Sequence, residues 1–140
     1  MSFNFLKPLP TPAEIRSQYP LTQHGLEVKR QKDQEVTDVI TGKSDKFLVI
    51  IGPCSADNET SVLDYVSRLS RVQEKVKDRL VLVPRIYTYK PRTNGDGYKG
   101  IAHQPNPEKR PDLVAGLIAM RRLQMRSIEE FGLPVADEML

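Results

Sequence analysis

Positive charge is concentrated in one segment of the chain, between Arg85 and Arg110. This segment holds six cations and two anions, a net charge of +4, whereas the whole chain of 140 residues carries only +3. Arginine presents a planar fork that matches a phosphate or a carboxylate, and lysine presents a point charge. Gly95 and Gly97 would let backbone N–H groups approach an anion closely. The segment therefore predicts a site for a phosphorylated or carboxylated small molecule.

The alternative interpretation of this segment is a solvated surface loop without a ligand. Arg85 argues against that alternative because it directly follows an apolar run, where a guanidinium turned inward without an anion would be costly. Gly95-Asp96-Gly97 is also compatible with an ordinary tight turn. Residue types alone do not identify an activity for this segment.

Two other residues whose side chains could take part in catalysis or binding lie just after apolar runs. Cys54 follows the run 47–51, and Glu138 follows the run 133–136. A lone cysteine after a strand is more often a small packing residue than a metal ligand or a nucleophile, so both interpretations of Cys54 stay open at this point.

The pattern of apolar residues predicts alternating helices and strands. Apolar runs are typical of strands in a parallel sheet. They predict strands at 47–51 and at 80–86, which includes Arg85, and a third strand that begins at 133–136. Helical spacing and capping residues predict helices at about 11–19, 22–41, 59–77 and 111–131. This order indicates a parallel α/β sheet, in which functional residues gather at the carboxyl ends of the strands.

Composition excludes several classes of protein. A single cysteine excludes an internal disulfide framework, and a net charge of +3 is too mild to indicate a nucleic-acid or membrane binder by itself. No run approaches the roughly 18 apolar residues of a membrane span, and the first residues lack a secretory pattern. We therefore expect a cytoplasmic protein with neither a membrane nor a nucleic acid as its partner.

Several short segments, taken in order, are more specific than any single residue. They are Ile51-Gly52-Pro53-Cys54-Ser55, Arg85-Ile86-Tyr87, Lys90-Pro91-Arg92-Thr93, Tyr98-Lys99-Gly100, and Gly132-Leu133-Pro134 with Glu138. Together they resemble the class I 3-deoxy-D-arabino-heptulosonate 7-phosphate (DAHP) synthases. The resemblance implies a TIM-type (β/α)8 barrel, of which residues 1–42 would form an N-terminal helical arm and residues 43–140 about the first three β/α units.

The reaction implied by the resemblance joins phosphoenolpyruvate to D-erythrose 4-phosphate and releases phosphate. It is the first step of the shikimate pathway toward chorismate and the aromatic amino acids, and it needs a divalent metal ion, Mn, Fe, Co or Zn. The family also implies a homo-oligomer and an aromatic amino acid as effector. Its remaining metal ligands, a His, a Glu and an Asp, come from later strands. We therefore expect the isolated chain to be inactive and, with unpaired strand edges, prone to associate.

The resemblance also assigns roles to individual residues of this chain. Cys54 matches a metal ligand, and Arg85 matches an arginine that binds the carboxylate or phosphate of phosphoenolpyruvate. Lys90 matches a catalytic lysine between the two substrates. The segment Pro91-Arg92-Thr93 matches the part that holds erythrose 4-phosphate, and Glu138 matches a carboxylate near the phosphoenolpyruvate site.

Two alternatives to a DAHP synthase predict different ligands. A 3-deoxy-D-manno-octulosonate 8-phosphate synthase-like enzyme would condense phosphoenolpyruvate with arabinose 5-phosphate, but its loop resembles Lys-Ala-Asn-Arg-Ser-Ser rather than Lys90-Pro91-Arg92-Thr93. A non-catalytic α/β module would bind an anionic partner or RNA, although few aromatic residues are interleaved with the cations for base stacking.

The segment 94–98 departs from the DAHP synthase pattern. It is one residue longer than the commoner family version, and Tyr98 stands in place of the usual Trp.

Overall fold

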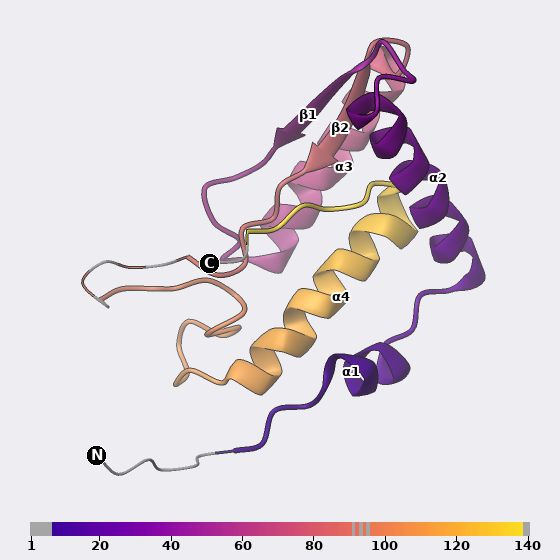
Figure 1. Ribbon diagram of the computed structural model, residues 1–140. Coiled ribbons are helices and arrows are strands. Elements are labelled where there is room, and N and C mark those ends of the chain that lie inside the picture. Colours follow the sequence, from indigo (N-terminus) through magenta and orange to yellow (C-terminus); the bar gives the residue numbers. More distant parts are fainter. Residues whose placement is uncertain (1–6, 91, 93, 95, 139–140) are drawn as a thin grey trace.

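A computed structural model describes residues 7–138 except residues 91, 93 and 95. Its elements follow the predicted order of two helices and then alternating strands and helices (Figure 1). They are α1 (Pro12–Gln18), α2 (Gln23–Ile40), β1 (Phe47–Ile51), α3 (Glu59–Val76), β2 (Leu80–Pro84) and α4 (Leu113–Phe131). The structure is thus mixed α/β with a small parallel sheet.

The helices begin where the sequence offers capping side chains. Thr11, Thr22, Asn58 and Asp112 each accept a hydrogen bond from a backbone N–H in the first turn of the following helix, which satisfies a donor that the helix itself leaves free. At the other end of α4, Gly132 adopts a left-handed backbone conformation with φ of 67°. Glycine reaches this conformation without a Cβ penalty, so the chain can leave the helix sharply there.

The two strands pair in parallel, with Phe47 opposite Leu80 and Ile51 opposite Pro84. The predicted third strand at 133–136 is wrong in extent, because only Ala136 pairs, as a single parallel bridge with Arg85. Two local features explain the difference. The N–H of Leu133 is still bonded to the carbonyl of Ser127 in α4, and Pro134 has no N–H to donate.

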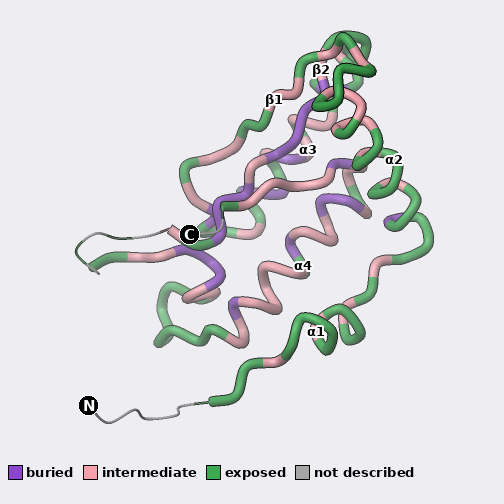
Figure 2. The backbone as a smooth tube through the Cα atoms, in the orientation of Figure 1, coloured by how far each residue is buried: buried purple, intermediate pink, exposed green. Residues whose placement is uncertain are grey.

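Helix α3 packs against β2, and α4, which lies below the sheet in Figure 1, packs against both α3 and α2. The buried core lies where α3, α4 and the segment after β2 meet (Figure 2). Val66 and Leu123 are completely buried there, and the side chain of Ile86, just after β2, completes the same cluster. The remaining cluster members are also apolar: Ala56, Val62, Leu63, Ile101 and Leu133. Burial of this surface is the main favourable contribution to the stability of the fold.

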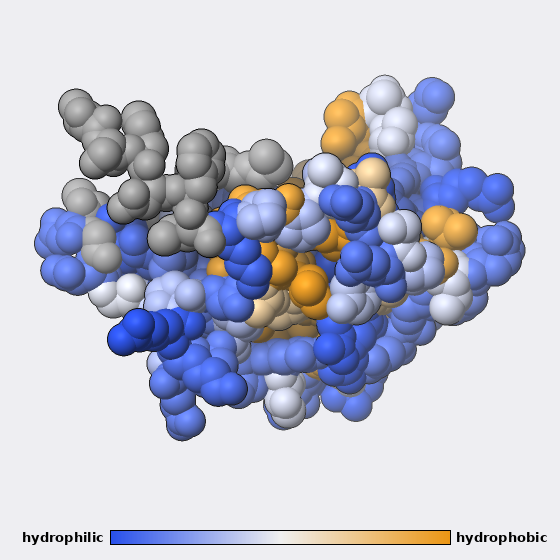
Figure 3. Space-filling view, turned by 90° about the horizontal axis from the view of Figure 1, so that it is seen from below, coloured by the Kyte–Doolittle hydropathy of each residue, from blue (hydrophilic) through white to orange (hydrophobic). Residues whose placement is uncertain are grey.

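The opposite face of the sheet is only partly covered. A groove of about 490 Å³ separates it from α2 and is lined by apolar side chains of both strands, Leu48, Ile50 and Val83 among them. Ile50, which lines this groove, remains 54% exposed, and Phe47 at the start of β1 is 73% exposed. Viewed from below, the molecule shows hydrophobic surface in a central hollow with hydrophilic side chains around it (Figure 3). Among the described residues, the outer edge of β1 has no paired strand.

The N-terminal helices are attached to α4 by polar contacts. The carboxylate of Glu129 accepts hydrogen bonds from the backbone N–H and the hydroxyl of Thr22, at 2.8 and 2.5 Å. Arg121 donates two hydrogen bonds to the carbonyl of Tyr19. These contacts fix the start of α2 against the middle and end of α4. None of the helices that the structure describes is both long and apolar enough to cross a membrane.

Candidate anion-binding site at the carboxyl ends of the strands

The site is built at the carboxyl rim, which we define as the ends of β1 and β2 together with the end of the segment that pairs through Ala136. Gly52 makes the turn after β1 possible, because a Cβ at this position would lie 1.8 Å from the carbonyl oxygen of Arg85. The two backbones can therefore approach closely, and the chain carries Pro53 and Cys54 across the end of β2. This local arrangement places the thiol at the rim.

Cys54 and Lys90 come into direct contact there. The ammonium group of Lys90 donates a hydrogen bond to the Cys54 sulfur at 3.0 Å, and the cysteine is exposed. This hydrogen bond and the charge of Lys90 lower the pKa of the thiol, with smaller contributions from Arg85 and Arg92, although partial burial opposes the shift. The backbone N–H of Lys90 is held by the carbonyl of Lys99 at 2.7 Å. The pair therefore favours a reactive thiolate beside a fixed ammonium group.

Arg85 lies beside this pair and is held on several sides. Its Nε donates to the carboxylate of Glu138 at 2.6 Å, and its Nη2 forms an ion pair with the same oxygen. Its Nη1 donates to the carbonyl of Pro53 at 3.2 Å. The guanidinium also stacks over the ring of Tyr87, 4.3 Å from the ring centre. Burial raises the pKa of the Tyr87 phenol, and the nearby negative charge of Glu138 raises it further.

A second carboxylate fixes the backbone around Glu138. Asp137 accepts hydrogen bonds from the N–H of Thr88 at 3.1 Å and from the N–H of Glu138 at 2.9 Å. The hydroxyl of Thr88, which is 2% exposed, donates to the other oxygen of Asp137. Asp137 thus connects the extension of β2 to the segment that carries Glu138.

Arg92 reaches the rim from the long loop between β2 and α4. Its Nε and Nη2 both donate to the carbonyl oxygen of Tyr98, at 3.1 and 3.0 Å, and the hydroxyl of Tyr98 donates to the carbonyl of Gln104. Burial raises the pKa of the Tyr98 phenol, and the charge of Asp57 adds to the shift. Tyr98 therefore holds both the guanidinium and the far side of the loop.

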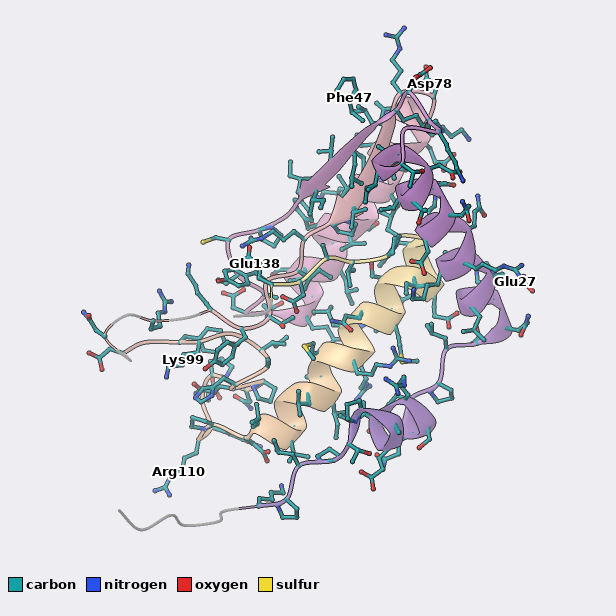
Figure 4. All side chains as sticks on the ribbon, viewed as in Figure 1. Glu27, Phe47, Asp78, Lys99, Arg110 and Glu138 are labelled. Atoms are coloured by element: carbon teal, nitrogen blue, oxygen red, sulfur yellow. The ribbon has the colours of Figure 1, made fainter. Side chains whose placement is uncertain are left out.

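The structure brings Cys54, Arg85, Lys90 and Glu138 to the carboxyl rim, and Arg92 is close enough to act on the Cys54 thiol. Glu138 lies at the rim, whereas Lys99 and Arg110 lie along the loop and near the start of α4 (Figure 4). Pro91 and Thr93 lie outside the described residues. Thr88 supports the site without having been singled out in the sequence, because nothing in its type or spacing signals Asp137 as its partner. Tyr87 belongs to the segment Arg85-Ile86-Tyr87, but its residue type did not indicate that its ring would lie against the Arg85 guanidinium.

The rim offers one thiolate to a metal ion. Among the described residues, no group of three or more His, Cys, Asp or Glu side chains is arranged to hold one. A borderline metal such as Zn needs several ligands, of which a Cys thiolate is a suitable member. Cys54 therefore fits as one ligand of a metal centre and does not constitute the centre.

Cations gathered at the carboxyl ends of parallel strands are typical of α/β proteins that bind small anions. The sequence model described as the DAHP synthetase I family matches residues 19–140, and the chain belongs to this family.

Two curated relatives and one solved structure show how far the similarity extends. The phospho-2-dehydro-3-deoxyheptonate aldolase of Haemophilus influenzae is 35% identical over 129 residues, which cover 92% of this chain and 35% of the relative. The phenylalanine-inhibited aldolase of Saccharomyces cerevisiae is 32% identical over 133 residues, 95% of this chain and 35% of the relative. The structure of the aldolase from Francisella tularensis superimposes with a TM-score of 0.89 at 27% identity, over 99% of this chain and 40% of that one. The chain thus spans little more than a third of the length of these curated relatives.

Proposed function

We propose that this chain is the N-terminal part of a 3-deoxy-7-phosphoheptulonate synthase. The whole enzyme would condense phosphoenolpyruvate with D-erythrose 4-phosphate to give DAHP and phosphate, the first step of the shikimate pathway. The observation that carries the proposal is the convergence of Cys54, Lys90, Arg85 and Glu138 at one rim, from segments far apart in a chain that belongs to the DAHP synthetase I family.

The rim provides groups suited to two anionic substrates. Arg85 would bind the carboxylate or phosphate of phosphoenolpyruvate, and Lys90 would lie between the two substrates as the catalytic lysine. Arg92, with its neighbours Pro91 and Thr93, would hold erythrose 4-phosphate. Fixed cations offset the repulsion between two phosphorylated molecules and orient them for reaction, which lowers the entropic barrier of the condensation.

Cys54 would contribute a thiolate ligand to a divalent metal, Mn, Fe, Co or Zn. When bound, such a metal supplies Lewis acidity that polarises the aldehyde of the acceptor. The contact with Lys90 supports this role because it favours the deprotonated thiol, the form that binds metals.

We further propose that residues 43–140 form the first part of an incomplete (β/α)8 barrel and residues 1–42 its N-terminal arm. The parallel pairing of β1 with β2 and the bridge at Ala136 are consistent with three successive β/α units. The exposed apolar residues of β1 and the apolar groove beside α2 are the surfaces that further strands would cover. The isolated chain would therefore lack activity, because it does not bring the other metal ligands.

Regulation and assembly extend the proposal. Relatives are named phenylalanine-inhibited in Saccharomyces cerevisiae, and Phe-sensitive and Tyr-sensitive in Escherichia coli. We propose that the full-length protein likewise responds to an aromatic amino acid, and that it is a homo-oligomer.

Ligand binding by the 140-residue chain tests the substrate class. Phosphoenolpyruvate and erythrose 4-phosphate should each shift NMR resonances at the rim, and arabinose 5-phosphate should bind more weakly than erythrose 4-phosphate. Lys90→Met should weaken binding of both substrates, whereas Lys109→Met, at the far end of the loop, should leave it unchanged. Preference for arabinose 5-phosphate would favour the octulosonate enzyme, and salt-dependent binding of an RNA oligonucleotide without phosphoenolpyruvate binding would favour the non-catalytic module.

A further inference from the structure

Three cations at the carboxyl rim donate to acceptors within the chain, but the acceptors differ in charge. Lys90 donates to the Cys54 sulfur, and Arg92 donates to the neutral carbonyl oxygen of Tyr98. Arg85 instead pairs with the carboxylate of Glu138. Of these three cations, Arg85 is therefore the one that is paired with a carboxylate, the kind of group that a substrate would also present.

The contact occupies the edge of the guanidinium that a ligand would use. Nε and Nη2, which form the fork that binds carboxylates and phosphates, both meet one oxygen of Glu138. Nη1 is taken by the carbonyl of Pro53, and one face of the guanidinium lies on the ring of Tyr87. The side chains of Arg85 and Glu138 are 25% and 42% exposed, so a dissolved anion can reach the pair.

We propose that Glu138 is an internal stand-in for the anionic group of the ligand: it holds the fork of Arg85 in the unliganded chain and gives way when a carboxylate or phosphate binds there. The proposal rests on the proposed function for the identity of the ligand, and it assigns Glu138 a role in setting affinity. The ion pair keeps the guanidinium oriented and neutralised until the ligand arrives. Binding then exchanges one anion for another at Arg85.

The surrounding contacts confine this exchange to one side chain. Asp137 holds the backbone N–H of Glu138 and is itself anchored to Thr88, which is buried. The backbone can therefore stay in place while the carboxylate of Glu138 rotates. The phenol of Tyr87 lies near the carboxylate of Glu138, whose negative charge raises the pKa of that phenol.

A purely structural role for Glu138 predicts the opposite effect on affinity. If Glu138 only positioned Arg85 for the ligand, removing its charge would loosen the guanidinium and weaken anion binding. If Glu138 competes with the ligand, removing its charge tightens anion binding. The sign of the change therefore separates the two roles.

The experiment titrates the 15N-labelled 140-residue chain with inorganic phosphate, and separately with phosphoenolpyruvate, following the Arg85 Nε–H resonance by NMR. Glu138→Gln keeps the size of the side chain and removes its charge, and it should bind both anions roughly fivefold more tightly, the scale expected when a part-exposed ion pair no longer competes. Glu130→Gln is the matched control. It makes the same change of net charge at an ion pair with Arg126 on α4, and should leave both affinities unchanged.

The outcomes separate this inference from the proposed function. Unchanged or weaker phosphate binding by Glu138→Gln overturns the inference, as does equal tightening by Glu130→Gln or the absence of phosphate binding by wild type and variant alike. If phosphoenolpyruvate binds the wild-type chain but Glu138→Gln does not tighten it, the inference fails and the proposed function stands. If Glu138→Gln tightens phosphate but phosphoenolpyruvate binds no better than phosphate, the inference stands and the proposed substrate fails.

Discussion

The substitution Gly52→Ala tests how the sheet positions the site. A Cβ at Gly52 would lie 1.8 Å from the carbonyl oxygen of Arg85 and 2.7 Å from its carbonyl carbon, whereas real Cβ atoms essentially never come within 3.0 Å of another atom. Because both partners are backbone, no side-chain rotation relieves the contact. The turn after β1 and the end of β2 must separate by about 1.2 Å to bring the oxygen contact to that limit.

This separation has a cost that follows from the contacts at the strand end. Forcing extra atoms into a packed site costs about 1–3 kcal/mol. The hydrogen bond from the Arg85 N–H to the carbonyl of Ile51, 2.9 Å long, lies at the same point, and its loss adds about 1 kcal/mol. We therefore expect Gly52→Ala to lower the free energy of unfolding by about 2–4 kcal/mol. Cys54, two residues further on, should also lose its contact with Lys90.

Urea unfolding followed by circular dichroism measures the first effect, and the rate of Cys54 alkylation by iodoacetamide measures the second. Gly25→Ala is the comparison, because its Cβ would meet the end of the Glu129 side chain, 2.3 Å away, which can rotate at the cost of its hydrogen bonds from Thr22, whereas the backbone at Gly52 has no such freedom. Gly52→Ala should be the less stable variant and should alkylate more slowly than wild type, since its thiol loses the neighbouring cation. If Gly52→Ala is as stable as Gly25→Ala and alkylates at the wild-type rate, the close approach does not position the site.

Three further predictions use the same chain. Because Lys90 lowers the pKa of the Cys54 thiol, Lys90→Met should shift the pH profile of alkylation upward and slow the reaction at neutral pH; an unchanged profile would show that the contact does not form in solution. Leu123→Ala removes a side chain with no exposed surface and should cost about 2–5 kcal/mol in urea unfolding, so a loss below that range would mean a looser core. The wild-type chain should self-associate in analytical ultracentrifugation, and Ile50→Lys on β1 should reduce this association; Val72→Lys, on a similarly exposed apolar residue of α3, should not, and equal effects would place the contact elsewhere.

The elements were predictable from the sequence where local chemistry specifies them. The four helices that the structure describes begin at the expected places. Each has a capping side chain that accepts a hydrogen bond from a backbone N–H of its first turn: Thr11, Thr22, Asn58 or Asp112. The strands 47–51 and 80–84 follow from apolar runs of the kind that is typical of strands in a parallel sheet. The third strand was overpredicted, because an apolar run does not reveal that Leu133 is still committed to the end of α4.

The site was predictable in its residues but not in its contacts. The types and order of Cys54, Arg85, Lys90 and Glu138 indicated a shared rim, and the structure brings these four side chains there. The partner of each cation depends on tertiary distances that the sequence does not encode locally. That Arg85 would pair with Glu138, 53 residues away, could not be read from either residue.

The attachment of Thr22 to Glu129 has a consequence for the order in which the protein folds. The two residues are 107 positions apart, so α2 leaves the ribosome long before its carboxylate partner has been synthesised. In the interval, the first part of the chain lacks the group that secures it, and proteases and chaperones have access to it. Docking of α2 should therefore be a late event that waits for α4, whereas α3 can pack on β2 as soon as both have emerged.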